Sequence, residues 1–140
     1  MRANAVFIAL VVATTPTWAT DCAVPSSPAG ITFINVIDER YSPDNPNAGG
    51  IVKLLPATDG SYELRVLNKG VTYSGRYTYA RLTDQVAQLH MIENFPGQPT
   101  DYNLTLVCLD NSTGTLVYTQ NTGAIRPERR QNTGRYTITD

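Results

Sequence analysis

The sequence has little of what catalytic and nucleic-acid-binding proteins usually depend on. In 140 residues it has one histidine, two cysteines and one tryptophan, and only 16% of the residues are charged. The 11 basic and 12 acidic side chains give a net charge of −1, which argues against a nucleic-acid partner because phosphates require a basic surface. One histidine and two cysteines cannot complete a zinc site. The length allows a single domain.

Motifs with a known chemical mechanism are also missing. The sequence contains no glycine-rich phosphate loop, no G-x-S-x-G nucleophile turn and no HExxH zinc motif. It therefore identifies no catalytic residue, no metal site and no cofactor, and it favours a function other than catalysis.

The first nineteen residues have the pattern of a secretory signal peptide. Arg2 gives a positive start, an apolar run covers Ala5–Ala13, and the small residues Thr17 and Ala19 stand before the expected cleavage point. The run is too short for a membrane-spanning helix, which takes about 20 residues, and no later segment is long and apolar enough. We expect a signal peptide over residues 1–19, a single secreted or periplasmic domain over residues 20–140, and no transmembrane segment.

Two cysteines in an exported chain predict one disulfide bond. Cys22 and Cys108 would close a loop of about 87 residues, worth up to roughly 4–5 kcal/mol in the chain-entropy account. A redox pair is disfavoured because the two cysteines lack CxxC spacing. A lipid anchor on Cys22 is the remaining alternative, although the residues before it lack the apolar and small pattern of such a site.

Alternating apolar and polar residues predict β-strands, whereas helical spacing does not recur outside the signal peptide. For example, Tyr62, Leu64 and Val66 share one face of a strand, and Glu63 and Arg65 share the other. Such half-polar strands fit an antiparallel sheet with one wet face. The expected strands are Ile31–Asp38, Ile51–Ala57, Ser61–Leu67, Arg76–Leu82 with Val71–Tyr73 as its start, Gln85–Ile92, Leu104–Leu109, Thr115–Thr119 and Gly134–Thr139.

Short turns such as Asp59-Gly60 and Thr83-Asp84 separate these strands. We predict an all-β fold, a single antiparallel meander of about eight strands closed as a barrel, with a β-sandwich as the alternative. Either arrangement removes or shields the exposed edges of the sheet. Three loops interrupt the pattern and are where function is expected, because the strands are committed to the core. They are Tyr41–Gly50, Asn94–Asp101 and Asn121–Thr133.

The second half of the chain resembles lipocalin-type, MoaF-like small β-barrels. The resemblance covers Gly75 to Ile138, about half of the mature chain, and rests on packing and turn motifs. These are Gly75-Arg76-Tyr77-Thr78-Tyr79, Ala87-Gln88-Leu89, Tyr102-Asn103-Leu104-Thr105-Leu106, Ser112-Thr113-Gly114-Thr115 and Gly134-Arg135-Tyr136-Thr137-Ile138. Cys108 stands where these domains commonly have an aromatic residue. The resemblance implies a lipocalin-like barrel with an interior cavity for a small apolar ligand, and it identifies no catalytic residue.

We therefore expect a non-catalytic protein that binds a small apolar or amphipathic ligand, or that serves as a structural module of the envelope. Arginine side chains would lie at the rim, and filling of the core is the alternative role for the tyrosines. An interior cavity of about 300 Å³ or more would favour ligand binding. The expected ligand contacts are Tyr62, Leu64, Tyr79, Leu89, Met91 and Tyr118.

Two other function classes are kept as alternatives. The first is a secreted interaction module, such as an adhesin, an inhibitor or a surface-complex subunit, that binds a protein partner through Tyr41–Gly50 and Asn121–Thr133. The second is an enzyme that uses His90 or Asp38. We interpret His90 as a residue on the wet face of a strand, because no partner motif accompanies it.

Three further polar features have a solvated and a functional interpretation. Asp38-Glu39-Arg40 is interpreted as a solvated rim, although its carboxylates could bind a cation. The cluster Arg126-Pro127-Glu128-Arg129-Arg130 is interpreted as a solvated loop, although it could recognise a carboxylate or an anionic surface. Asn103 and Asn111 begin glycosylation sequons that matter only in a eukaryotic host.

Overall fold

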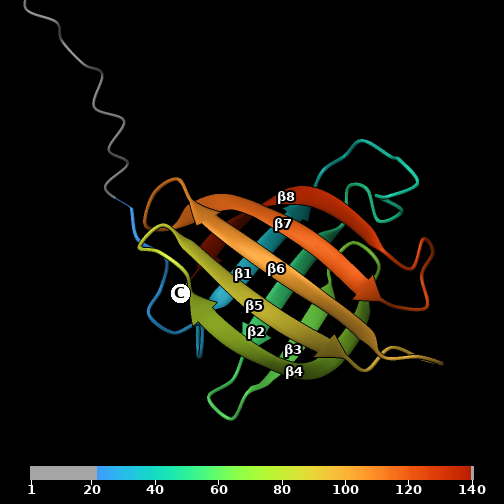
Figure 1. The fold of residues 1–140 in the computed structure, drawn as a ribbon, viewed down its shortest axis with the longest axis horizontal. Coiled ribbons are helices and arrows are strands. Elements are labelled where there is room, and N and C mark those ends of the chain that lie inside the picture. The colour runs from blue at the N-terminus through green and yellow to red at the C-terminus, as the bar shows by residue number, and fades with distance from the viewer. Residues whose placement is uncertain (1–21, 140) are drawn as a thin grey trace, which may run out of the picture.

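The computed structural model describes residues 22–139, which form an antiparallel β-barrel (Figure 1). The expected signal peptide lies outside these residues. Each strand pairs with the next along the chain, and the last strand pairs with the first, so the sheet closes. The strands are β1 (Thr32–Ile37), β2 (Ile51–Pro56), β3 (Ser61–Val66), β4 (Val71–Arg81), β5 (Val86–Glu93), β6 (Thr100–Cys108), β7 (Thr113–Thr122) and β8 (Arg130–Thr139).

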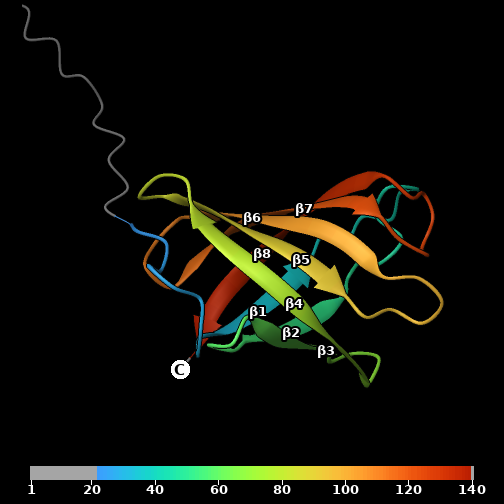
Figure 2. The same ribbon diagram turned by 60° about the horizontal axis from the view of Figure 1, so that its bottom comes forward.

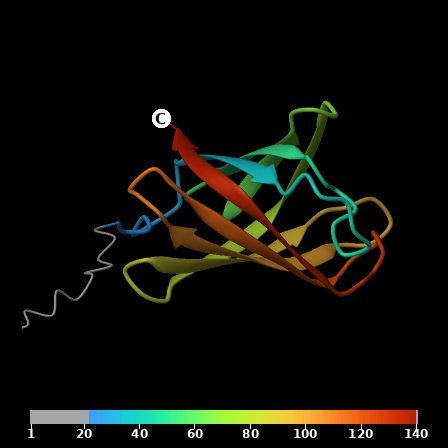
Figure 3. The ribbon, with the colours of Figure 1, turned by 90° about the horizontal axis from the view of Figure 1, so that it is seen from above.

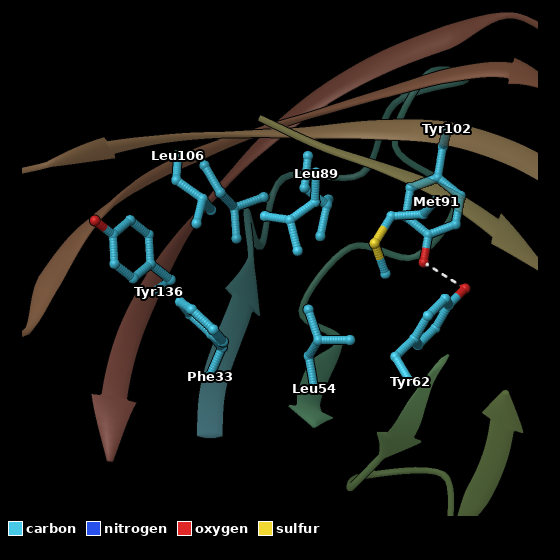
Figure 4. Close-up of a cluster of buried hydrophobic side chains, with 10 residues drawn as sticks. Phe33, Leu54, Tyr62, Leu89, Met91, Tyr102, Leu106 and Tyr136 are labelled. Atoms are coloured by element: carbon cyan, nitrogen blue, oxygen red, sulfur yellow. Dashed lines mark hydrogen bonds between the residues drawn. The ribbon is translucent and has the colours of Figure 1, made fainter. Parts of the chain in front are cut away.

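The closed meander confirms the predicted fold class and replaces the sandwich alternative. The two-residue alternation is clearest in β6, where buried and partly buried positions alternate along the whole strand. Inward side chains from all eight strands meet in the barrel interior, which is the geometry that period-2 patterning requires. Figure 4 shows the cluster of buried side chains in this interior, where Phe33, Leu54, Leu89 and Leu106 pack together.

The strands β6, β7 and β8 are longer than the sequence pattern indicates. β8 begins at Arg130 instead of Gly134, and the expected loop over Asn121–Thr133 shrinks to residues 123–129. The reason is visible in the register, where Gln120 of β7 faces Arg130 of β8. Both side chains are polar and buried, so the strands continue through a region that has no apolar alternation.

The N-terminal segment covers one end of the barrel, and the disulfide holds it there. Cys22 is bonded to Cys108, which confirms the predicted disulfide. The Val24 amide donates to the Asp84 carbonyl at 2.9 Å, and the hydroxyl of Tyr79 donates to the Pro25 carbonyl. Figures 2 and 3 show this segment, in blue, at the same end of the barrel as the C-terminal end of β8.

The opposite end carries the loops that follow β1, β3, β5 and β7, because consecutive strands run in opposite directions. Three of these loops lie together on the right of Figure 3. Asn45 stabilises the longest, since its side-chain amide donates to the Asp38 carbonyl at 2.8 Å and to the Arg40 carbonyl at 2.9 Å. We call this the open end and the disulfide-bonded end the closed end.

Candidate functional site

A cavity of about 200 Å³ occupies the half of the barrel toward the open end. Apolar side chains of four strands form much of its wall: Val52, Leu64, Val66, Leu104 and Leu116. Polar side chains point into the same space: Asn35, Glu93, Tyr102, Tyr118, Gln120 and Arg130. An apolar wall with a few convergent polar groups is typical of small-molecule sites.

The cavity is smaller than the volume of about 300 Å³ at which such sites usually begin. It exceeds the roughly 150 Å³ that holds benzene in an engineered protein cavity. Its volume of about 200 Å³ therefore suits a molecule built on one small ring or a short branched chain, and it is too small for a long fatty acid.

The cavity reaches the surface at the open end. Its lining includes the exposed residues Lys69 and Val71, on the β3–β4 turn and at the start of β4. Asn47 of the β1–β2 loop and Ile125 of the β7–β8 loop complete this part of the wall. A ligand can therefore enter between loops, whereas the N-terminal segment covers the closed end.

Glu93 brings a carboxyl group into the cavity wall and is only 8% exposed. The Tyr102 hydroxyl donates to its Oε2 at 3.3 Å, and the hydroxyls of Tyr102 and Tyr62 are also 3.3 Å apart (Figure 4). Gly75 makes this arrangement possible, because a Cβ there would lie 2.8 Å from the Tyr62 ring and 2.1 Å from the Ile92 carbonyl oxygen. The glycine thus leaves the space in which Tyr62 reaches the network.

Burial controls the protonation of this network. It raises the pKa of Glu93 to about 6, although hydrogen bonds from Tyr102 and Tyr62 act in the opposite direction. Burial also raises the pKa of Tyr62, and that of Tyr102 lies well above its usual value. The tyrosine hydroxyls are therefore protonated donors at neutral pH, and Glu93 can change its charge near pH 6.

Arg130 lies on the other side of the site and is 6% exposed. Its Nη1 donates to the Ile125 carbonyl at 3.2 Å, and its guanidinium carbon lies 5.5 Å from the centre of the Tyr118 ring. Its Nε is buried and has no acceptor. No carboxylate of residues 22–139 lies within 4.0 Å of the guanidinium. Within the described residues, the buried guanidinium thus lines the cavity without a carboxylate in ion-pair contact.

The residues around Arg130 form a second hydrogen-bond network. The Tyr118 hydroxyl donates to Gln120 Oε1 at 2.8 Å, and Gln120 Nε2 donates to the carbonyls of Ile125 and Glu128. Burial raises the pKa of Tyr118 to about 12, while the charge of Arg130 and a hydrogen bond with it lower that pKa. The Tyr118 and Tyr102 ring centres are 4.9 Å apart, so the two networks meet across an aromatic contact.

Asn35 of β1 adds a further unsatisfied group. Its side chain is 6% exposed and lines the cavity, and its Oδ1 has no hydrogen-bond donor. A buried acceptor without a partner carries a free-energy cost.

The residues expected to contact a ligand separate into two groups. Leu64 and Tyr118 line the cavity. Tyr62, Leu89 and Met91 belong to the packed core beside it (Figure 4). Tyr79 contacts the N-terminal segment at the closed end. The structure therefore brings together only part of the expected set.

Sequence reasoning missed the polar groups that characterise this site. The interpretation of Arg126–Arg130 as a solvated loop is wrong for Arg130, which belongs to β8 and is buried. Glu93 and Gln120 were also not identified, because a polar residue at the end of a strand looks like a residue of the following loop. Alternate residues of a strand share a face, so Glu93 shares the inward face of Met91. This was the one signal in the sequence that could have placed Glu93 inside the barrel.

The other polar features considered from the sequence lie outside the cavity. His90 is exposed on the outer surface, where its Nε2 lies 3.0 Å from Asp101 Oδ1, which also accepts from Asn121 at 2.8 Å. Asp38 is exposed in the β1–β2 loop. Over residues 22–139, no three His, Cys, Asp or Glu side chains are placed to hold a metal ion. The described segment also contains no helix with the length and hydropathy to cross a membrane.

No protein-family model matches the chain, and neither does any curated protein or solved structure. The resemblance to lipocalin-type barrels therefore stays a prediction that rests on sequence motifs.

Proposed function

We propose that this protein is a binding protein that holds a small amphipathic molecule inside its barrel. The observation that carries the proposal is the cavity of about 200 Å³ with an apolar wall and buried polar groups directed into it. A ligand-holding barrel is also what the resemblance to lipocalin-type proteins implies. The apolar wall would contribute affinity, and the polar groups would set orientation.

The buried polar groups support a binding site over a packing defect. An eight-stranded barrel can be filled by its own side chains, as it is around Phe33 and Leu89 in the closed half. In the open half, Asn35 Oδ1 and Arg130 Nε are buried without partners. Unsatisfied buried groups lower stability, so their presence beside a cavity favours a role that is completed by a bound molecule.

Small neutral aromatic probes test the proposal directly. We expect toluene and nitrobenzene to shift the NMR signals of Leu64 and Leu116, and calorimetry to give one site per chain. Leu64→Trp should fill part of the cavity and weaken binding at least tenfold. Arg65→Trp is the matched control, because Arg65 lies on the outer face of the same strand and is exposed. Binding that survives Leu64→Trp, or no binding at all, would reject the cavity site.

Failure of every probe while the sheet remains intact would favour the interaction module that acts through its loops. That alternative requires no interior site. Its binding surface would be the open end, where Tyr41 is 74% exposed and Leu67 is 50% exposed.

We also propose that the protein is exported and works outside the reducing cytoplasm. The Cys22–Cys108 disulfide supports this, because such bonds persist in oxidising compartments. If residues 1–19 are removed, Trp18 leaves with them, and the mature protein should show tyrosine fluorescence alone. N-terminal sequencing of protein recovered from the periplasm or medium should begin at Thr20, and an intact N-terminus would contradict export by this signal.

A further inference from the structure

We propose that the ligand is a small organic monoanion, a carboxylate on an apolar body, and that Arg130 binds its carboxylate group. The inference rests on the proposed function, since it names the chemical class of the molecule that the cavity takes. It is carried by the position of a buried, uncompensated guanidinium in the cavity wall.

Arg130 carries its positive charge in a buried position. Its side chain is 6% exposed, and no carboxylate of the described chain lies within 4.0 Å of it. Buried cations are normally paired, because removing them from water is costly. An anion from outside the chain would provide the missing partner.

The guanidinium of Arg130 is only partly engaged by the protein. Nη1 is engaged with the Ile125 carbonyl, and Nε has no acceptor but is enclosed by protein atoms, so a ligand oxygen reaches it only after a small shift of the side chain. A guanidinium binds carboxylates through neighbouring N–H groups in a planar fork, and such charge-assisted hydrogen bonds are among the stronger ones in proteins. The contact with Tyr118 and the bond to Ile125 hold the guanidinium in place before a ligand arrives. Little ordering of this side chain is then required on binding.

A purely structural role explains Arg130 poorly. Its guanidinium forms a hydrogen bond with Tyr118 and donates to the Ile125 carbonyl in the β7–β8 loop. Gln120 already donates to that carbonyl at 3.1 Å and to the Glu128 carbonyl at 2.9 Å. The neutral side chain of Gln120 therefore already holds the β7–β8 loop, and holding this loop does not require a buried positive charge.

The remaining groups of the cavity restrict the anion further. Glu93 lines the same cavity, so a ligand with two negative charges would be repelled by its carboxylate when that group is ionised. The ionised carboxylate repels a monoanion less than a dianion, and a single guanidinium can pair with only one carboxylate group. The volume of about 200 Å³ and the wall of Leu64, Leu104 and Leu116 fit a single ring or a short branched chain attached to the carboxylate.

Benzoate and nitrobenzene provide a matched pair of probes, because they have nearly the same shape and differ in charge. We expect calorimetry at pH 7 and low salt to show benzoate binding on the order of tenfold more tightly than nitrobenzene. Arg130→Met should abolish this preference and leave nitrobenzene affinity within about twofold. Arg129→Met is the control, because Arg129 is exposed on the neighbouring loop and should change neither affinity. Arg130→Gln provides a second variant if the methionine variant does not fold.

Phenyl phosphate, a dianion at this pH, should bind more weakly than benzoate. Nitrobenzene binding without a preference for benzoate, a preference that survives in both Arg130 variants, or tighter binding of phenyl phosphate would each overturn the inference and leave the cavity site standing. Absence of binding by both benzoate and nitrobenzene would reject the cavity site itself and the inference with it.

Discussion

The guanidinium carbon of Arg130 lies 5.5 Å from the centre of the Tyr118 ring, so a buried cation is held against an aromatic face and not against a carboxylate. A cation over an aromatic ring gains on the order of 0.5–2 kcal/mol. The effective cost of burying an ion is several kcal/mol. The contact with Tyr118 therefore offsets only part of the burial cost, and Arg130 should reduce stability in the absence of a ligand.

Replacing Arg130 with methionine tests this cost. Methionine keeps much of the length of the chain and removes the charge, so we expect the free energy of unfolding to stay the same or to rise by about 1–2 kcal/mol. Urea denaturation measures the change, with Arg129→Met as an exposed control that should stay within about 0.5 kcal/mol. A loss of more than about 2 kcal/mol would show that Arg130 is a structural brace of the β7–β8 loop.

The disulfide should supply a large part of the stability of this small barrel. Cys22 and Cys108 are 86 residues apart in the sequence, and closing such a loop is worth up to roughly 4–5 kcal/mol in the chain-entropy account. We expect the double variant Cys22→Ser, Cys108→Ser to lose several kcal/mol of unfolding free energy in urea denaturation.

The same comparison has an internal control. Reduction of the native protein should lower its stability by a similar amount, whereas the double serine variant should not respond to a reductant. A double variant as stable as the native protein would contradict the role of the disulfide as the clamp of the closed end.

The fold was predictable from the sequence where the barrel interior is apolar. Tyr62, Leu64 and Val66 alternate with charged residues, and the structure places Tyr62 in the core and Leu64 and Val66 in the cavity wall. In that region, the alternation of apolar and polar residues coincides with the alternation of inward and outward side chains. The disulfide followed from the export signal and the count of two cysteines.

The site was not predictable in the same way, because its inward residues are polar. Arg130 and Gln120 face each other across β7 and β8, yet their sequence context is rich in Asn, Thr, Gly and Arg and resembles a loop. Only closure of the barrel, which depends on contacts between distant strands, shows that these side chains point inward. Propensity therefore failed where the inward side chains of the barrel are polar.

Gly75 is expected to be intolerant of any side chain. A Cβ at this position would lie 2.1 Å from the Ile92 carbonyl oxygen and 2.8 Å from the Tyr62 ring, so β4 and β5 would have to separate or the ring would have to move. We expect Gly75→Ala to destabilise the protein by at least about 1–3 kcal/mol. Thermal denaturation followed by circular dichroism measures this effect.

Ser74→Ala is the matched control, since Ser74 is the preceding residue of β4 and is exposed. It should stay within about 0.5 kcal/mol of the native protein. If Gly75→Ala were equally mild, the close packing of Tyr62 over β4 would be wrong.

Glu93 should make stability depend on pH in a defined window. Its pKa is raised by burial from 4.5 to about 6, so below pH 4.5 the folded and unfolded chains both hold the proton. Between pH 4.5 and about 6 the unfolded chain releases it first, and the free energy of unfolding should therefore fall as pH rises, by about 2 kcal/mol in total. Urea denaturation at roughly pH 4.5, 5.3, 6 and 7 covers this window and measures how the free energy of unfolding changes with pH.

Glu93→Gln isolates this contribution, because glutamine keeps an acceptor for the Tyr102 hydroxyl and carries no charge. The variant should be more stable than the native protein above pH 6, by about 2 kcal/mol, and equally stable below pH 4.5. Hydrogen bonds lower the pKa of Asp59 and of Asp110, so these carboxylates affect stability at lower pH than Glu93 does. Their effect has the opposite sign, because it makes the free energy of unfolding rise with pH. The other groups that face Glu93 are Tyr62, Tyr102 and Tyr118, whose raised pKa values keep them neutral throughout. A pH slope that is unchanged in the Gln variant would place the titrating group elsewhere.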